Sequence, residues 1–213
     1  MFPRRRRLTA RIGFPVLLIL AGLASYFCFP RLRLAAHASQ LQSLSELQEV
    51  DAHRYDQEWF DAARVGRVDI LSALYYAHYP LDAKTPAGYT ALILAAYDEH
   101  PAALAYLLLA GANPCLGDRN GNTALMGALY KGELTIARRL LKTRCPIDQM
   151  NNAGETALSF AALFGRLDIL PELVALGADP NHVDARGDTA LVIARKQGNA
   201  QAAAALRKLG ATH

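Results

Sequence analysis

The sequence lacks the residue combinations that catalytic and metal sites require. Its six histidines show no metal-ligand spacing such as H-E-x-x-H, and it contains neither a glycine-rich phosphate loop nor a G-x-S-x-G motif. The acidic residues are scattered over predicted turns and helix starts, as solvated caps are. These absences argue against an enzyme, and we expect no catalytic residue, metal or cofactor.

Acidic residues are missing altogether from positions 1–38, which contain seven arginines. The chain has 23 basic and 19 acidic residues, so the remainder holds 16 basic against 19 acidic residues, a formal charge of −3. The positive charge therefore belongs to the N-terminus alone. Because the rest of the chain is mildly acidic, it has no general attraction for phosphate, and we expect no nucleic-acid partner.

Charge is also missing from residues 12–29, an apolar run of 18 residues. As a helix this run is about 27 Å long, close to the hydrocarbon thickness of a bilayer. One interpretation is a cleaved signal peptide, and Ala36-His37-Ala38 resembles a cleavage site. That site lies far beyond the apolar core, however, with Arg31 and Arg33 between them. The pattern favours an uncleaved transmembrane signal anchor that contacts the lipid bilayer.

Five arginines precede the apolar run and two follow it. Since cytoplasmic flanks carry the excess of positive charge, residues 1–11 are predicted to be a cytoplasmic tail. Everything after Phe29 then lies on the far side of the membrane. The short arginine-rich start favours a single-pass bacterial inner-membrane protein with its remaining residues in the periplasm. The alternative is a secreted protein released by cleavage.

Residues 30–54 are predicted to form a linker or capping helix. Leu41, Leu44, Leu47 and Val50 recur every three residues, a spacing typical of one helical face. Such a helix either packs on the first unit of the following region as a cap or extends the membrane helix as a stalk. We favour the cap.

The remaining chain is repetitive. Gly88, Gly121, Gly154 and Gly187 are 33 residues apart, and each is followed two residues later by threonine, alanine and leucine. A degenerate copy precedes them. Five units are thus predicted, with approximate limits 55–87, 88–120, 121–153, 154–186 and 187–213.

Each repeated position has a mechanical reason. Threonine is a good helix N-cap, and the glycine two residues before it suits a turn with positive φ. Pairs such as Ala95-Ala96 allow close helix contact, whereas Leu104 and Leu107 give the second helix of a unit its apolar stripe. Gly111 is placed to end that helix. No unit can bury its apolar surface alone, so stacking must stabilise the array.

This pattern resembles the ankyrin repeat over residues 55–213, down to the Gly-Ala-Asp-Pro-Asn of residues 177–181. The resemblance implies an all-α fold: an ankyrin-repeat solenoid of about five helix-turn-helix units, here preceded by one transmembrane helix. Two departures are visible. The histidine of the family's T-P-L-H opening is absent, and Arg144-Cys145-Pro146 replaces Gly-Ala-Asp, so the helix before it should end less cleanly.

The resemblance further implies protein binding through a concave face, formed by hairpin tips and the exposed side of the first helices. Tyr97, Tyr130 and Leu163 share one repeat position. Exposed aromatic residues are typical binding hot spots. The alternative is that these rings serve only to pack adjacent units against each other. The predicted partner-binding residues are Tyr89, Tyr97, Asp98, Arg119, Asn120, Asn122, Tyr130, Lys131, Met150, Asn152, Glu155, Leu163 and Phe164. The alternative function is that of a secreted ankyrin-repeat protein, released by signal-peptide cleavage, that acts as an effector or as an accessory in oxidant defence.

Two of the three cysteines, Cys115 and Cys145, lie in the repeats. A disulfide is possible in an oxidising compartment, but it requires Cα atoms within about 7 Å of each other. The two residues occupy non-equivalent positions of adjacent units, about one repeat spacing apart. This placement favours a free pair.

Overall fold

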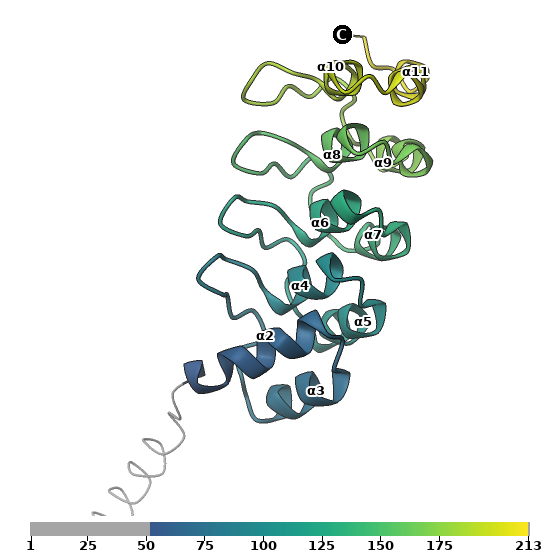
Figure 1. Ribbon diagram of the computed structural model, residues 1–213. Helices are drawn as coiled ribbons and strands as arrows, with labels where there is room; N and C mark the ends of the chain where they lie inside the picture. Colours follow the sequence, from purple (N-terminus) through teal and green to yellow (C-terminus); the bar gives the residue numbers. More distant parts are fainter. Residues whose placement is uncertain (1–51, 213) are drawn as a thin grey trace, which may run out of the picture. The chain divides into compact units, whose positions relative to one another are not determined.

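Five pairs of antiparallel helices follow one another along residues 52–212, the part of the chain that the computed structural model describes (Figure 1). The first helices of the pairs are α2 (Asp56–Arg64), α4 (Ala91–Tyr97), α6 (Ala124–Lys131), α8 (Ala157–Leu163) and α10 (Ala190–Lys196). The second helices are α3 (Val68–Tyr76), α5 (Pro101–Ala110), α7 (Leu134–Leu140), α9 (Leu170–Ala175) and α11 (Ala200–Lys208). Two 3₁₀-helices, η1 (Ala52–Tyr55) and η2 (Leu167–Ile169), precede α2 and α9.

The two helices of each pair belong to two rows, and long hairpin loops project to one side of the stack (Figure 1). Within the described residues β-structure is limited to isolated bridges, Gly117 with Thr123 and Val183 with Thr189. The predicted all-α architecture is therefore confirmed for this part of the chain.

The predicted tail 1–11, the predicted span 12–29 and nearly all of the predicted linker 30–54 lie outside the described residues. Among residues 52–212, no helix has both the length and the apolar character needed to cross a bilayer.

The threonines begin the first helices as predicted. Thr90, Thr123 and Thr156 are in extended conformation, and each side-chain oxygen accepts a hydrogen bond from the backbone N–H three residues later. In the fourth unit Ser159 completes a capping box, because its hydroxyl oxygen accepts a bond from the Thr156 N–H at 2.7 Å. Ser159 stands where the family pattern has histidine, and in this unit its side chain forms the second bond of the cap.

The second helices end in two ways. Gly111 ends α5 with a φ of 96°, the left-handed conformation that glycine adopts without strain. Helix α7 has no such residue: its C-cap Leu141 stays right-handed, and the Thr143 hydroxyl bonds back to the Leu140 carbonyl at 2.7 Å. The prediction that this helix ends less cleanly is confirmed.

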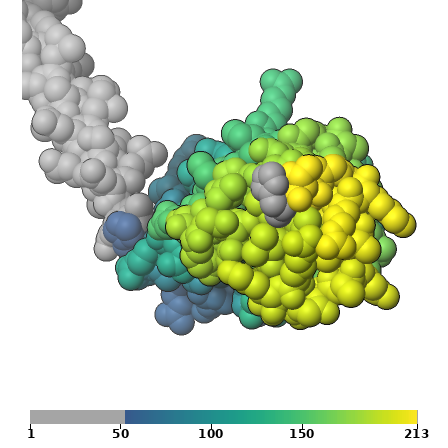
Figure 2. Space-filling model, turned by 90° about the horizontal axis from the view of Figure 1, so that it is seen from above, coloured from purple at the N-terminus to yellow at the C-terminus, as the bar shows by residue number. Residues whose placement is uncertain are grey.

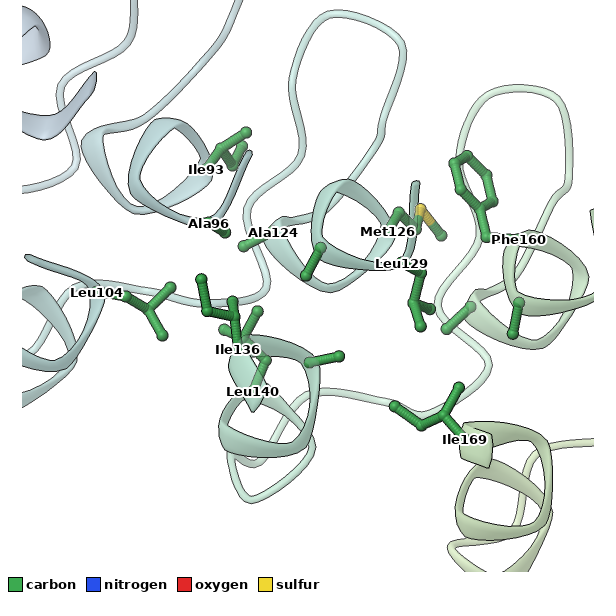
Figure 3. Close-up of a cluster of buried hydrophobic side chains, with 14 of the residues drawn as sticks. Ile93, Ala96, Leu104, Ala124, Met126, Leu129, Ile136, Leu140, Phe160 and Ile169 are labelled. Carbon is green, nitrogen blue, oxygen red and sulfur yellow. The ribbon is translucent and has the colours of Figure 1, made fainter. Parts of the chain in front are cut away.

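The apolar core runs continuously between the two rows (Figure 3). Ala96 and Ala124 meet between α4 and α6, where small side chains let the helices approach closely (Figure 3). Leu129 of α6, Ile136 of α7 and Ile169 of η2 are at most 1% exposed. Burying each such side chain stabilises the fold by about 1.5–3 kcal/mol, but only when the neighbouring unit is present. The last unit covers the end of the stack (Figure 2).

Candidate binding surface on the hairpin face

The hairpin loops form a rigid edge because each is hydrogen-bonded to the loop before it. The Arg119 N–H donates to the Ala87 carbonyl at 2.9 Å, and the Asn152 N–H donates to the Asn120 carbonyl at 2.8 Å. The next pair, Ala185 and Ala153, repeats the bond at 3.0 Å. We call this edge, together with the adjacent exposed side chains of the first helices, the hairpin face.

Inside each of the last three loops one side chain fixes the turn. Asp118, Asn151 and Asp184 occupy the same repeat position, and one oxygen of each accepts two backbone N–H bonds of 2.8–3.0 Å. The turn therefore tolerates either aspartate or asparagine at this position.

Several predicted partner-binding residues are engaged in holding these loops. The guanidinium of Arg119 donates to the Pro86 carbonyl, and the Asn152 side chain donates to the Arg119 carbonyl at 2.9 Å. Asn122 and Glu155 both accept bonds from the Asn151 amide, each at 2.9 Å. These residues shape the hairpin face, and their role in binding stays a prediction.

The aromatic residues pack on one another across units and remain accessible. The rings of Tyr97 and Tyr130 are stacked, with centroids 5.6 Å apart, and Phe164 meets Tyr130 edge-on at 4.9 Å. Tyr97 is nevertheless 37% exposed and Tyr130 44% exposed. Packing between units thus fixes the rings in place, which lowers the entropy cost of using their exposed atoms in binding.

Two further interactions characterise the electrostatics of this surface. The Lys131 ammonium lies 4.9 Å from the centroid of the Tyr97 ring, within the range of a cation–π interaction. Partial desolvation raises the pKa of the Tyr97 hydroxyl, with smaller contributions from Tyr130, Tyr89 and Asp98. Tyr97 therefore carries a neutral hydroxyl at physiological pH.

A pocket of about 180 Å³ opens among these rings. Gly127 lies in its wall, at the repeat position that holds Leu94, Phe160 and Ile193 in the other complete units. A Cβ at Gly127 would meet the Tyr97 ring at 3.7 Å, an ordinary contact. The glycine therefore leaves open a space that a larger side chain occupies in its neighbours.

The pocket contains five of the predicted residues and five others. The predicted residues in its lining are Tyr89, Tyr97, Asn120, Asn122 and Tyr130. The residues that were not predicted are Ile93, Asp118, Thr123, Gly127 and Phe160. Outside it lie Asp98, Arg119, Lys131, Met150, Asn152, Glu155, Leu163 and Phe164. The sequence signal for the pocket is Gly127, the lone glycine in an otherwise bulky repeat position.

The expectation of a free cysteine pair is wrong. Cys115 and Cys145 form a disulfide with their Cα atoms 5.4 Å apart. Cys145 comes three residues earlier in its unit than Cys115 does in its own, so the bond links the loop after α7 to the loop after α5. The distance between equivalent positions of two units does not apply to such an offset pair.

Within residues 52–212 no group of three or more histidine, cysteine, aspartate or glutamate side chains could hold a metal ion.

Residues 59–151 and 130–213 match a family model described as ankyrin repeats (3 copies). No individual curated protein matches the chain.

Proposed function

This chain belongs to the ankyrin repeat family, and we propose that it is a scaffold tethered to the bacterial inner membrane that presents its concave surface to a periplasmic protein. Ankyrin repeats are in general non-catalytic and bind other proteins. The observation that carries the proposal is the pocket among Tyr89, Tyr97 and Tyr130, because accessible tyrosines held rigidly around a hollow are typical of binding hot spots.

The disulfide supports export of the repeat domain. Structural disulfides persist in oxidising compartments such as the periplasm and are rare in the reducing cytosol. The bond between Cys115 and Cys145 thus agrees with the apolar run 12–29 and with its arginine imbalance, which are independent features of the sequence.

The binding surface is tested by crosslinking in membranes followed by mass spectrometry. We expect Tyr97→Ala combined with Tyr130→Ala to abolish recovery of the partner, because the pocket loses two of its aromatic walls. The matched control is Tyr76→Ala, which removes a tyrosine that is 75% exposed on α3 and lies outside the pocket. Recovery of the same partners by the double variant, at the level of the control, would contradict the proposal.

The topology is tested by reporter fusions at the C-terminus. An alkaline phosphatase fusion should be active, since this enzyme requires an oxidising compartment. A reporter that functions only in the cytosol should be inactive there. Activity of the cytosolic reporter is the outcome that rules out the proposed orientation.

A secreted protein released by cleavage is the second candidate, and the Ala36-His37-Ala38 sequence favours it. The two differ in the N-terminus of the mature protein. If the protein is tethered, N-terminal sequencing should find the intact N-terminus, and the protein should be in the membrane fraction. A mature start at Ser39 in the soluble fraction would support release.

A further inference from the structure

We infer that the hairpin-face pocket binds an arginine side chain of the partner protein, with its guanidinium group paired to Asp118. This inference rests on the proposed function and specifies the chemistry of the same site. It comes from a comparison of two loops that share one turn geometry but differ in what occupies it.

In the loop between the fourth and fifth units, the chain supplies its own guanidinium. One carboxylate oxygen of Asp184 accepts the backbone N–H bonds of Arg186 and Asp188. The other oxygen accepts bonds from the Arg186 side chain, at 3.2 Å from Nε and 2.9 Å from Nη2. The same Nη2 donates to Glu155 of the preceding loop at 2.6 Å.

The loop between the second and third units has the same turn without the arginine. Asp118 occupies the position of Asp184, and its Oδ1 accepts the two backbone bonds, from Asn120 and Asn122, at 2.8 and 2.9 Å. Asn120 stands at the position of Arg186. Within the described residues, the one hydrogen bond to Oδ2 of Asp118 comes from the Asn122 side chain at 3.4 Å. This oxygen therefore keeps the acceptor capacity that a guanidinium uses in the later loop.

The surroundings of this open position suit a guanidinium. At the later junction Arg186 also pairs with Glu155. The residue at the corresponding position of the earlier junction is Tyr89, so an aromatic ring replaces this second carboxylate. Tyr89, Tyr97 and Asp118 all line the pocket. A planar guanidinium stacks on aromatic faces while its N–H groups pair with a carboxylate.

The size of the pocket agrees with a single long side chain, and Asp118, the one charged residue of its lining, agrees with a cationic one. The volume of about 180 Å³ is below the range of about 300–1,000 Å³ that is typical of drug-sized ligands. Lys131 shows that the Tyr97 ring accepts a cation, since its ammonium lies 4.9 Å from the ring centroid. Arginine is favoured over lysine because its N–H groups can donate to the carboxylate while the flat guanidinium plane stacks on a ring.

The test is a titration of the full-length, isotope-labelled protein in detergent micelles, followed by NMR. The probe is N-acetylarginine amide, and the reference is N-acetylcitrulline amide, which has a similar shape without the charge. We expect the arginine probe to shift the Asn120 and Gly127 amide signals and to bind about tenfold more tightly than citrulline, which corresponds to about 1.4 kcal/mol.

Three variants copy residues that other units already tolerate. Asn120→Arg reproduces Arg186 and should fill the site from within, whereas Asp118→Asn reproduces Asn151, which keeps both backbone bonds of its turn. Gly127→Leu reproduces Leu94 and should fill the pocket. Asn120→Arg and Asp118→Asn should each weaken binding of the arginine probe about tenfold, the effect of losing one charge-assisted contact. Gly127→Leu should weaken it by about the same factor, because the leucine side chain occupies the space that the probe needs.

The matched control is Asp168→Asn, which removes one exposed carboxylate outside the pocket and should leave probe binding unchanged. Equal binding of arginine and citrulline, or unchanged binding in both Asn120→Arg and Asp118→Asn, would overturn the inference. If the double tyrosine variant loses the partner but the arginine probe does not bind, the arginine inference alone fails. If the probe binds but no partner depends on the tyrosines, the scaffold proposal fails.

Discussion

The junction between the second and third units and the junction between the fourth and fifth differ in what occupies the same place. At the later junction Arg186 closes the loop by pairing with Asp184 and Glu155. At the earlier one Asn120 leaves Asp118 open, and Gly127 adds a hollow beside it. Both loops have the same turn, which the repeat determines. The pocket arises from the residues that depart from the repeat pattern, Asn120 and Gly127.

The two junctions also differ in how they are held together. The second and third units are joined covalently through Cys115 and Cys145. Helix α7 of the third unit lacks the left-handed glycine that follows α5 and α9, and the cysteine bond lies directly after this weaker helix end. The open junction is thus the one that carries a covalent tie.

Removing this tie should have the largest effect. Reduction, or the double change Cys115→Ser with Cys145→Ser, releases a loop closed across a sequence separation of 30 residues. The loss of loop-closure entropy predicts a destabilisation of about 3–4 kcal/mol. Urea denaturation with and without reductant measures it. The serine variant is the control, because its stability should not respond to reductant; an oxidised wild type no more stable than the reduced one would contradict the role of the bond.

Helix caps should have a smaller effect that differs between units. Thr123→Ala removes one N-cap bond, for which we expect a loss of about 1 kcal/mol. Thr156→Ala removes a cap bond and also disrupts the capping box with Ser159, so its loss should be larger, up to about 2 kcal/mol. Denaturation of the two single variants compares them. Equal losses would show that the Ser159 bond contributes nothing.

The junction between the fourth and fifth units, which Arg186 closes, should give the stability of the fold a small dependence on pH. Burial raises the pKa of Asp184, but bonds from the Asp188 and Arg186 backbone and from the Arg186 side chain outweigh it and lower the pKa below its ordinary value. The folded state therefore holds this carboxylate ionised more strongly than the unfolded state does. Its contribution is present above about pH 4, the unfolded value, and is lost as pH falls through the folded pKa.

Acid titrations of stability in wild type and Asp184→Asn should test this effect. The variant should retain the turn, as Asn151 does, and should lose less stability than wild type below pH 4. Parallel curves for the two proteins would show that the Asp184 charge adds nothing to the closed junction.

The periodic part of this molecule was predictable from the sequence. Threonine caps, turn glycines and leucine stripes recur every 33 residues because each unit forms the same turn and the same pair of helices. Thr90 could therefore be assigned as a helix cap and Leu104 as a core residue from their positions alone. The offset pair Cys115 and Cys145 could not, since the distance between non-equivalent positions depends on how the loops run.

The site was only partly predictable for a related reason. The stacked rings of Tyr97 and Tyr130 followed from their shared repeat position. The pocket depends on what Gly127 lacks, and it becomes visible only when side-chain volumes in neighbouring units are compared. Bonds such as that from Asn151 to Asn122 link loops through side chains that do not repeat, so no periodic pattern indicates them.

The most direct measurement is photo-crosslinking in native membranes from position 120 of the full-length protein. We expect an adduct with one partner from this position, loss of that adduct when Gly127→Leu is added, and no such adduct from Arg139, an exposed residue of α7. An adduct that forms equally from both positions, or that persists when the pocket is filled, would contradict binding of the partner in the pocket.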